Sequence, residues 1–201
     1  MVAVSLKKKN AEPWAIVAGT DGALWLTEIG GNRLVRMSTS GQVIEYPIPS
    51  PASRAYDLAE GPDGSFWFVE FDTNRIARLA PVAPRTLVEF PVSGANPNLA
   101  GIALGPDGNV WFGVQGNNTV GRMTPAGVVT EFPVPTANAN PYGIAAGPDG
   151  NLWFTERTAN AVGRITPTGT VTEFPVLTPA SSPLHIAAGP DGNLWFTQVD
   201  G

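Results

Sequence analysis

Three glutamates recur at one position of a repeated pattern and could bring carboxylates together around a cation. Glu28, Glu70 and Glu156 each follow a tryptophan by three residues. Hard cations such as Mg²⁺ favour carboxylate oxygens, which makes these side chains candidate metal ligands. The alternative is a structural role, in which each carboxylate pairs with a backbone amide or a nearby arginine. The arginines considered for that role are Arg36, Arg78 and Arg164.

The elements that must position these residues come from an internal repeat, which is the first feature to seek in a sequence of this kind. An Asp-Gly pair followed three residues later by a tryptophan occurs five times. The tryptophans are Trp25, Trp67, Trp111, Trp153 and Trp195, which gives a repeat of about 42 residues. A Glu-aromatic-Pro triplet follows in the first four copies. The second copy is longer, because a loop spans residues 80–86 where the fourth copy has a tight turn.

The fourth copy shows the local structure that each repeat should form. Its predicted strands are 143–146, 152–156, 161–165 and 170–174, and Gly150 supplies the positive φ of a hairpin turn. Four short antiparallel strands in each copy are typical of a propeller blade. We expect the small residues of the first strand to line the axis and the tryptophan to pack between blades. A solenoid of four-stranded units is the main structural alternative.

The sequence therefore predicts an all-β protein, a β-propeller that forms a single domain over residues 1–201. Its blade units are 11–52, 53–96, 97–138, 139–180 and a partial unit of 181–201 together with 1–10. Two arrangements are open. Val2–Lys8 could supply a strand that closes a five-bladed ring, or the chain could be a piece of a larger propeller.

Three aromatic residues share a position near the start of their repeats and are candidate ligand-binding residues. They are Trp14, Tyr56 and Tyr142. An aromatic-lined depression at the mouth of a propeller suits a small molecule or a peptide. The alternative is that these rings only fill the channel entrance.

Composition excludes several classes of function. The net charge of −5 gives no basic face for nucleic acid. The absence of cysteine excludes disulfides and thiolate chemistry. No apolar run is long enough to span a membrane or to serve as a signal peptide, so we expect no membrane partner. A cytoplasmic location is the default expectation, and secretion is the expectation if an N-terminal segment is missing.

The fourth repeat resembles the virginiamycin B lyase family, also called streptogramin lyases. The resemblance rests on Pro141–Glu156, Val162–Pro167 and Thr172–Pro175, and it extends over nearly the whole chain. It implies a seven-bladed propeller that opens streptogramin B antibiotics, which are cyclic depsipeptides, by elimination and so confers antibiotic resistance. It also implies a histidine general base and Mg²⁺ held through glutamate side chains.

The family's site pattern, Glu-x-His-Gly/Ala-Ile followed by Trp-Phe-x-Glu, is incomplete in every copy. The family's histidine position holds Trp14, Tyr56, Ala100, Tyr142 and Leu184. The chain's one histidine, His185, comes one residue later and is the candidate general base. The resemblance gives Glu12, Glu28, Glu70 and Glu156 as candidate metal ligands. The alternative for His185 is an ordinary strand position, because a shift of one residue turns a side chain to the other face.

Three functions follow as expectations. The preferred one is a binding or scaffold member of the family without the full catalytic set, with a small molecule or peptide as partner. The first alternative is a Mg²⁺-dependent carbon–oxygen lyase that acts on streptogramin B. The second alternative is a self-associating chain that completes a ring as a homo-oligomer.

Overall fold

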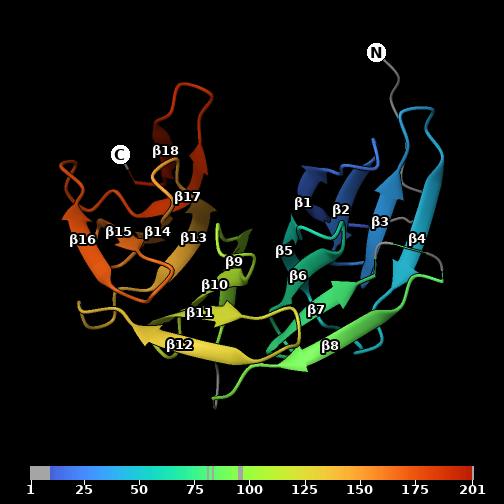
Figure 1. Cartoon of the computed structure of the whole chain (residues 1–201), viewed down its shortest axis with the longest axis horizontal. Coiled ribbons are helices and arrows are strands. Elements are labelled where there is room, and N and C mark those ends of the chain that lie inside the picture. The colour runs from blue at the N-terminus through green and yellow to red at the C-terminus, as the bar shows by residue number, and fades with distance from the viewer. Residues whose placement is uncertain (1–9, 81, 83, 95–96, 201) are drawn as a thin grey trace. The chain divides into compact units, whose positions relative to one another are not determined.

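The chain folds into β-strands and turns over the residues that the computed structural model describes, which are 10–80, 82, 84–94 and 97–200. Two compact units make up the chain, Met1–Pro91 and Val92–Gly201 (Figure 1). Within the described residues, no helix has the length and apolar character needed to cross a membrane. The single-domain organisation stays a prediction, and the closing strand expected at Val2–Lys8 lies outside the described residues.

The first unit contains two four-stranded antiparallel sheets, named blade 1 and blade 2. Blade 1 comprises β1 (Pro13–Ala18), β2 (Leu24–Glu28), β3 (Arg33–Met37) and β4 (Val43–Pro47). Blade 2 comprises β5 (Ala55–Glu60), β6 (Phe66–Glu70), β7 (Arg75–Leu79) and β8 (Leu87–Pro91). Strands that follow one another in the sequence are also neighbours in each sheet, which is the order of a propeller blade.

The second unit contains blade 3, blade 4 and the two-stranded blade 5. Blade 3 comprises β9 (Leu99–Leu104), β10 (Val110–Val114), β11 (Thr119–Met123) and β12 (Val129–Pro133). Blade 4 comprises β13 (Pro141–Ala146), β14 (Leu152–Glu156), β15 (Ala161–Ile165) and β16 (Val171–Pro175). Blade 5 comprises β17 (Pro183–Ala188) and β18 (Leu194–Gln198). The predicted four full blades and one partial blade are confirmed.

The Asp-Gly turns form as predicted because glycine adopts the left-handed conformation that each turn needs. Gly150, between β13 and β14, has a φ of 75°. The preceding Asp149 accepts hydrogen bonds from Trp153 Nε1 at 3.1 Å and from the backbone N–H of Asn151 at 3.2 Å. Burial opposes ionisation, but hydrogen bonds from Asn151 and Trp153 outweigh it and hold the pKa of Asp149 below its usual value. The turn thereby fixes the indole as well as the backbone.

The tryptophan of the second strand packs between blades, as predicted. In the first unit Trp25 is fully buried, and its ring stacks on Phe66 of blade 2 with the centroids 4.2 Å apart. Tyr46 stacks on Trp25 as well, at 5.5 Å. Leu34 and Leu58 complete this core from the two sheets. The interior of the unit is therefore the layer between its two blades.

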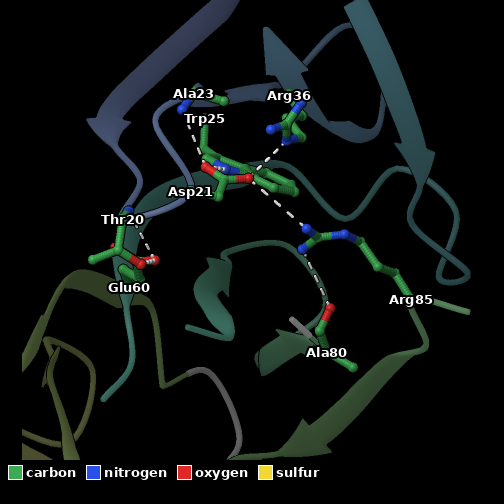
Figure 2. A network of polar contacts seen from close by, with 8 residues as sticks. All are labelled: Thr20, Asp21, Ala23, Trp25, Arg36, Glu60, Ala80 and Arg85. Atoms are coloured by element: carbon green, nitrogen blue, oxygen red, sulfur yellow. Dashed lines mark hydrogen bonds and ion pairs between the residues drawn. The ribbon is translucent and has the colours of Figure 1, made fainter. Parts of the chain in front are cut away.

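A polar network crosses the same pair of blades at the turn end of the strands (Figure 2). Asp21 accepts a hydrogen bond from Arg36 Nε at 2.7 Å, and Arg85 Nη2 lies 3.8 Å from the same carboxylate. Arg85 comes from the longer loop of the second repeat. Nearby, Glu60 of β5 accepts hydrogen bonds from the backbone N–H and the hydroxyl of Thr20, at 2.9 and 2.7 Å.

The asparagines that follow the second strands fix the links between blades. Asn32, Asn74, Asn118 and Asn160 all have φ between 50° and 54°. The side chain of Asn118 donates to the carbonyls of Val134 and Thr136, and its oxygen accepts from the Ala139 backbone N–H at 2.7 Å. Through these contacts the Asn118 side chain holds the link that leads from blade 3 into blade 4.

Candidate functional site

Trp14, Tyr56 and Phe71 form a row of contacting rings on the first unit. Trp14 in β1 and Tyr56 in β5 have ring centroids 4.7 Å apart, and Phe71, which follows β6, stacks on Tyr56 at 5.2 Å. The guanidinium carbon of Arg54 lies 5.7 Å from the Tyr56 centroid and 5.5 Å from that of Phe71. Trp14 is 51% exposed, so part of its ring surface is available to a ligand. We call these four residues the aromatic row.

The aromatic row combines apolar ring surface with a positive charge. Rings of this kind contact apolar or planar parts of a ligand, and a guanidinium beside them favours an anionic or electron-rich group. Asp72 lies 3.5 Å from Arg54 Nη1 and offsets part of that charge. The sequence identified Trp14 and Tyr56 but missed Phe71 and Arg54. The sequence does set Phe71 apart, because no other repeat has an aromatic residue at that position.

In the second unit, Tyr142 of β13 meets the predicted base His185 of β17. Their rings meet edge to face with centroids 5.7 Å apart. His185 is exposed, and its backbone N–H donates to the Thr197 hydroxyl at 3.1 Å. The pairing of β17 with β18 is irregular between Pro183 and Ile186, so strict alternation of faces does not hold around His185. The contact with Tyr142 uses the His185 ring as an aromatic surface. The role of His185 as a general base stays a prediction.

The three recurrent glutamates are fully buried at the ends of the second strands, but their surroundings differ. In blade 1, Arg33 neutralises Glu28: its Nε lies 2.5 Å from Glu28 Oε2, and its Nη1 lies 2.7 Å from Glu45 Oε2. Arg33 stands directly across from Glu28 in the β2–β3 pair. One guanidinium therefore bridges the carboxylates of the second and fourth strands.

In blade 2, a hydroxyl group rather than a guanidinium is the hydrogen-bond partner of the buried Glu70 carboxylate. Thr73 donates its hydroxyl proton to Glu70 Oε2 at 2.7 Å. Arg75 occupies the cross-strand position, but its Nη1 donates to the Ser50 hydroxyl at 3.1 Å. Burial, together with the nearby Glu89 carboxylate, raises the pKa of Glu70 to about 7.

Glu156 in blade 4 has neither the threonine nor the cross-strand arginine found in the other two blades. The positions of the compensating threonine and arginine hold Ala159 and Ala161. Among the described residues, neither carboxylate oxygen of Glu156 has a hydrogen-bond partner. Burial and the adjacent Glu173 carboxylate raise the pKa of Glu156 to about 8. Near neutral pH Glu156 therefore keeps its proton, which avoids two negative charges side by side on Glu156 and Glu173.

The arginine partners expected for the glutamates are corrected by the structure. Arg36 and Arg78 bind the turn carboxylates of Asp21 and Asp63. Arg164 lies over the Trp153 ring at 5.9 Å. All three stand opposite the tryptophan of the second strand, and the glutamate three residues later points to the other face of the sheet.

Among the described residues, the candidate metal ligands are not gathered into one group. In the part of the chain that the structure describes, no group of three or more histidine, cysteine, aspartate or glutamate side chains is placed to hold a metal. Glu12 is exposed with a φ of 49°, and Glu28 is already bound to Arg33. The metal role of Glu12, Glu28, Glu70 and Glu156 stays a prediction.

Comparison with known proteins identifies the relatives of this architecture. The sequence profile of the virginiamycin B lyase family matches residues 1–201. Two crystal structures of virginiamycin B lyase from Staphylococcus aureus are 38% identical to the chain, with TM-scores of 0.91 and 0.92 over 96% of its length. One of them is a catalytically inactive histidine-to-alanine variant with quinupristin. No curated protein matches the chain.

A third structure, a streptogramin B lyase, is 29% identical with a TM-score of 0.67, over 96% of this chain and 78% of that one. The chain spans 65% of the length of the two S. aureus enzymes. These matches confirm the β-propeller fold class.

Proposed function

The chain belongs to the virginiamycin B lyase family, and we propose that it acts there as a ligand-binding propeller rather than as a catalyst. The ligand class is a small molecule or peptide that places an apolar ring against the aromatic row. One observation supports this most directly: the half-exposed Trp14 ring contacts Tyr56, which stacks in turn on Phe71 beside Arg54. Aromatic anchors beside a cation are typical of binding surfaces.

The polar residues also support binding over bond cleavage. A general base needs a partner that orients it or a nearby charge that tunes it. The ring contact of His185 is with Tyr142, and Glu28 and Glu70 are bound by Arg33 and Thr73 of their own blades. The residues that resemble the family's catalytic pattern are thus spread over several repeats, each with a different local partner.

Quinupristin is the probe for this proposal, because a relative that is 38% identical was crystallised with it. Isothermal titration calorimetry of the full chain should show saturable binding. Trp14→Ala should weaken binding about tenfold or more, since aromatic anchors are worth at least 1–2 kcal/mol. The matched control is Val128→Ala, which removes an exposed apolar side chain in a turn of blade 3. Equal affinity of the Trp14→Ala variant and the unmutated chain would contradict the proposal.

The same incubation with Mg²⁺ decides between binding and catalysis. Because elimination leaves the mass of the ring-opened product unchanged, the assay must separate it from the intact ring by chromatography before mass spectrometry. We expect the ring to stay intact. Metal-dependent ring opening would overturn the non-catalytic assignment.

Lyase activity is the second candidate, and the 38% identity to virginiamycin B lyase favours it. In that case His185 is the residue to take the proton, as the chain's one imidazole. His185→Ala should then abolish ring opening while leaving quinupristin binding in place. Ring opening at an unchanged rate in this variant would exclude His185 as the base.

A further inference from the structure

A hollow of about 280 Å³ lies between blades 3 and 4 of the second unit. On the blade 3 side, the backbone N–H of Gln115 donates to the Asn98 carbonyl at 3.2 Å, which ties the start of β9 to the end of β10. On the blade 4 side, the backbone N–H of Arg157 donates to the Asn140 carbonyl at 3.1 Å, which does the same for β13 and β14. The residues that line the hollow are Asn98, Gln115, Gly116, Asn138, Asn140 and Thr158.

Side-chain amides and one hydroxyl line this hollow, and none of the described residues that line it is charged. A side-chain amide offers a carbonyl acceptor and two N–H donors, and a hydroxyl both donates and accepts. The fold leaves one of these groups unused: Asn140 Oδ1 is buried and, within the described part of the chain, has no hydrogen-bond partner. Because a buried acceptor without a donor is costly, a ligand donor that reaches this oxygen removes that cost.

The corresponding place between blades 1 and 2 shows that the backbone does not require these amides. Backbone hydrogen bonds of the same kind identify Glu12 and Arg54 as the counterparts of Asn98 and Asn140. The φ angles of Glu12 and Arg54 are 49° and 56°, and those of Asn98 and Asn140 are 48° and 60°. Asparagine is favoured in this left-handed conformation, but glutamate and arginine adopt it here as well. The two asparagines therefore need a reason that lies in their side chains.

The two places also differ in charge. Between blades 1 and 2, Arg54 Nη1 lies 3.5 Å from the Asp72 carboxylate. Between blades 3 and 4, the same two positions hold Asn140 and Thr158. A charged ligand would lose hydration there without gaining a counter-charge from the lining residues. The hollow therefore favours a neutral ligand that forms hydrogen bonds.

We propose that the hollow between blades 3 and 4 binds one ring of a neutral sugar. Sugar hydroxyls donate and accept hydrogen bonds at the same atom, which matches the mixture of donors and acceptors on the lining amides and on Thr158. Sites for drug-sized ligands have volumes of about 300–1,000 Å³, so a hollow of about 280 Å³ suits a single ring better than an extended peptide. The inference goes beyond the proposed function, because the aromatic row contributes no residue to this hollow.

Proton–nitrogen correlation NMR of the isotope-labelled full chain tests the proposal. The probes are D-glucose, D-galactose, D-mannose and N-acetyl-D-glucosamine, each titrated alone, and tetraglycine serves as the peptide probe. We expect at least one sugar to shift the side-chain amide signals of Asn98, Gln115 and Asn140 in a saturable way. The signals of Gln42, an exposed amide between β3 and β4, should stay unchanged. This map needs no variant, so it tests the site even if a substitution prevents folding.

Two substitutions then measure the contribution of the amides. Asn98→Ala and Asn140→Ala should each weaken sugar binding about fivefold, the effect of one hydrogen bond. Alanine suits this backbone, because Ala52 and Ala180 adopt a φ of 51° in neighbouring links. Gln42→Ala is the matched control and should bind like the unmutated chain.

Three results would overturn the proposal. The first is the absence of a saturable shift with all four sugars. The second is sugar binding that neither Asn98→Ala nor Asn140→Ala weakens. The third is tighter binding of tetraglycine than of any sugar, which would assign the hollow to a peptide backbone. Quinupristin binding at the aromatic row is measured separately, so failure of one proposal leaves the other standing.

Discussion

The guanidinium carbon of Arg85 lies 4.9 Å from the ring centroid of Trp25, and its Nη2 forms an ion pair with the Asp21 carboxylate at 3.8 Å (Figure 2). Arg85 belongs to blade 2 and Trp25 to blade 1, so this contact joins the two sheets of the first unit. It comes from the longer loop of the second repeat, which places a cation over a tryptophan that is already packed between blades.

Removal of Arg85 should loosen this junction. We expect Arg85→Ala to lower the free energy of unfolding of the first unit by about 1 kcal/mol, the usual size of a partly buried cation–π contact. Urea denaturation followed by tryptophan fluorescence measures the change. Arg157→Ala, at an exposed position after β14, is the control and should have little effect. Equal losses in the two variants would contradict a specific role for Arg85.

Substitution of Arg33 should lower the free energy of unfolding more than substitution of an exposed arginine. Its side chain is 11% exposed and is paired with a carboxylate that is 0% exposed. Arg33→Met should therefore lower the free energy of unfolding by about 3–5 kcal/mol, because it leaves Glu28 buried without its counter-charge. Addition of Glu28→Gln to this variant should restore part of the loss. Denaturant titration of the single and double variants measures the coupling, and additive losses would contradict the pairing.

Stability should fall as the pH rises through neutrality, because two buried carboxyls have raised pKa values. Glu70 and Glu156 hold their protons in the folded chain up to pH values of about 7 and about 8, whereas the unfolded chain releases them near 4.5. The stabilisation is complete below pH 4.5 and is lost as the pH rises through these folded-state values. Each group contributes a slope of about 1.4 kcal/mol per pH unit inside its window.

Glu156→Gln isolates the contribution of blade 4. In this variant the free energy of unfolding should vary less between pH 5 and 8 than in the unmutated chain. The matched control is Glu131→Gln in blade 3, where Val114 replaces the buried glutamate, so that no carboxyl pair forms. Denaturation at closely spaced pH values provides the comparison. Parallel curves for Glu156→Gln and the unmutated chain would show that Glu156 titrates normally.

Ala161→Arg should give blade 4 the arrangement found in blade 1. Ala161 stands across from Glu156 as Arg33 stands across from Glu28. The added guanidinium should stabilise the ionised carboxylate, so the gain in the free energy of unfolding should be larger at pH 9 than at pH 5, by about 1–3 kcal/mol. An equal effect at both pH values would mean that the new side chain does not reach the pair.

Local sequence alone determined the repeat, the strands and the turns. Gly150 takes the positive φ that the Asp-Gly turn requires, and β14 and β15 have the predicted bounds of 152–156 and 161–165. These features depend on residues a few positions apart, on the alternation of side chains along a strand and on the preference of glycine for certain backbone angles. The five copies of the Asp-Gly and tryptophan pattern likewise predicted four full blades and one partial blade.

Tertiary structure decided which side chains meet. Glu28, Glu70 and Glu156 look alike in sequence, yet Glu28 is paired with Arg33, Glu70 accepts a hydrogen bond from Thr73 and Glu156 lies beside the Glu173 carboxylate. Their protonation depends on cross-strand register and burial, which the repeat pattern does not encode. The aromatic row likewise joins residues from different repeat positions on neighbouring blades. Spacing along the chain fixes the blades, but packing between them sets the chemistry.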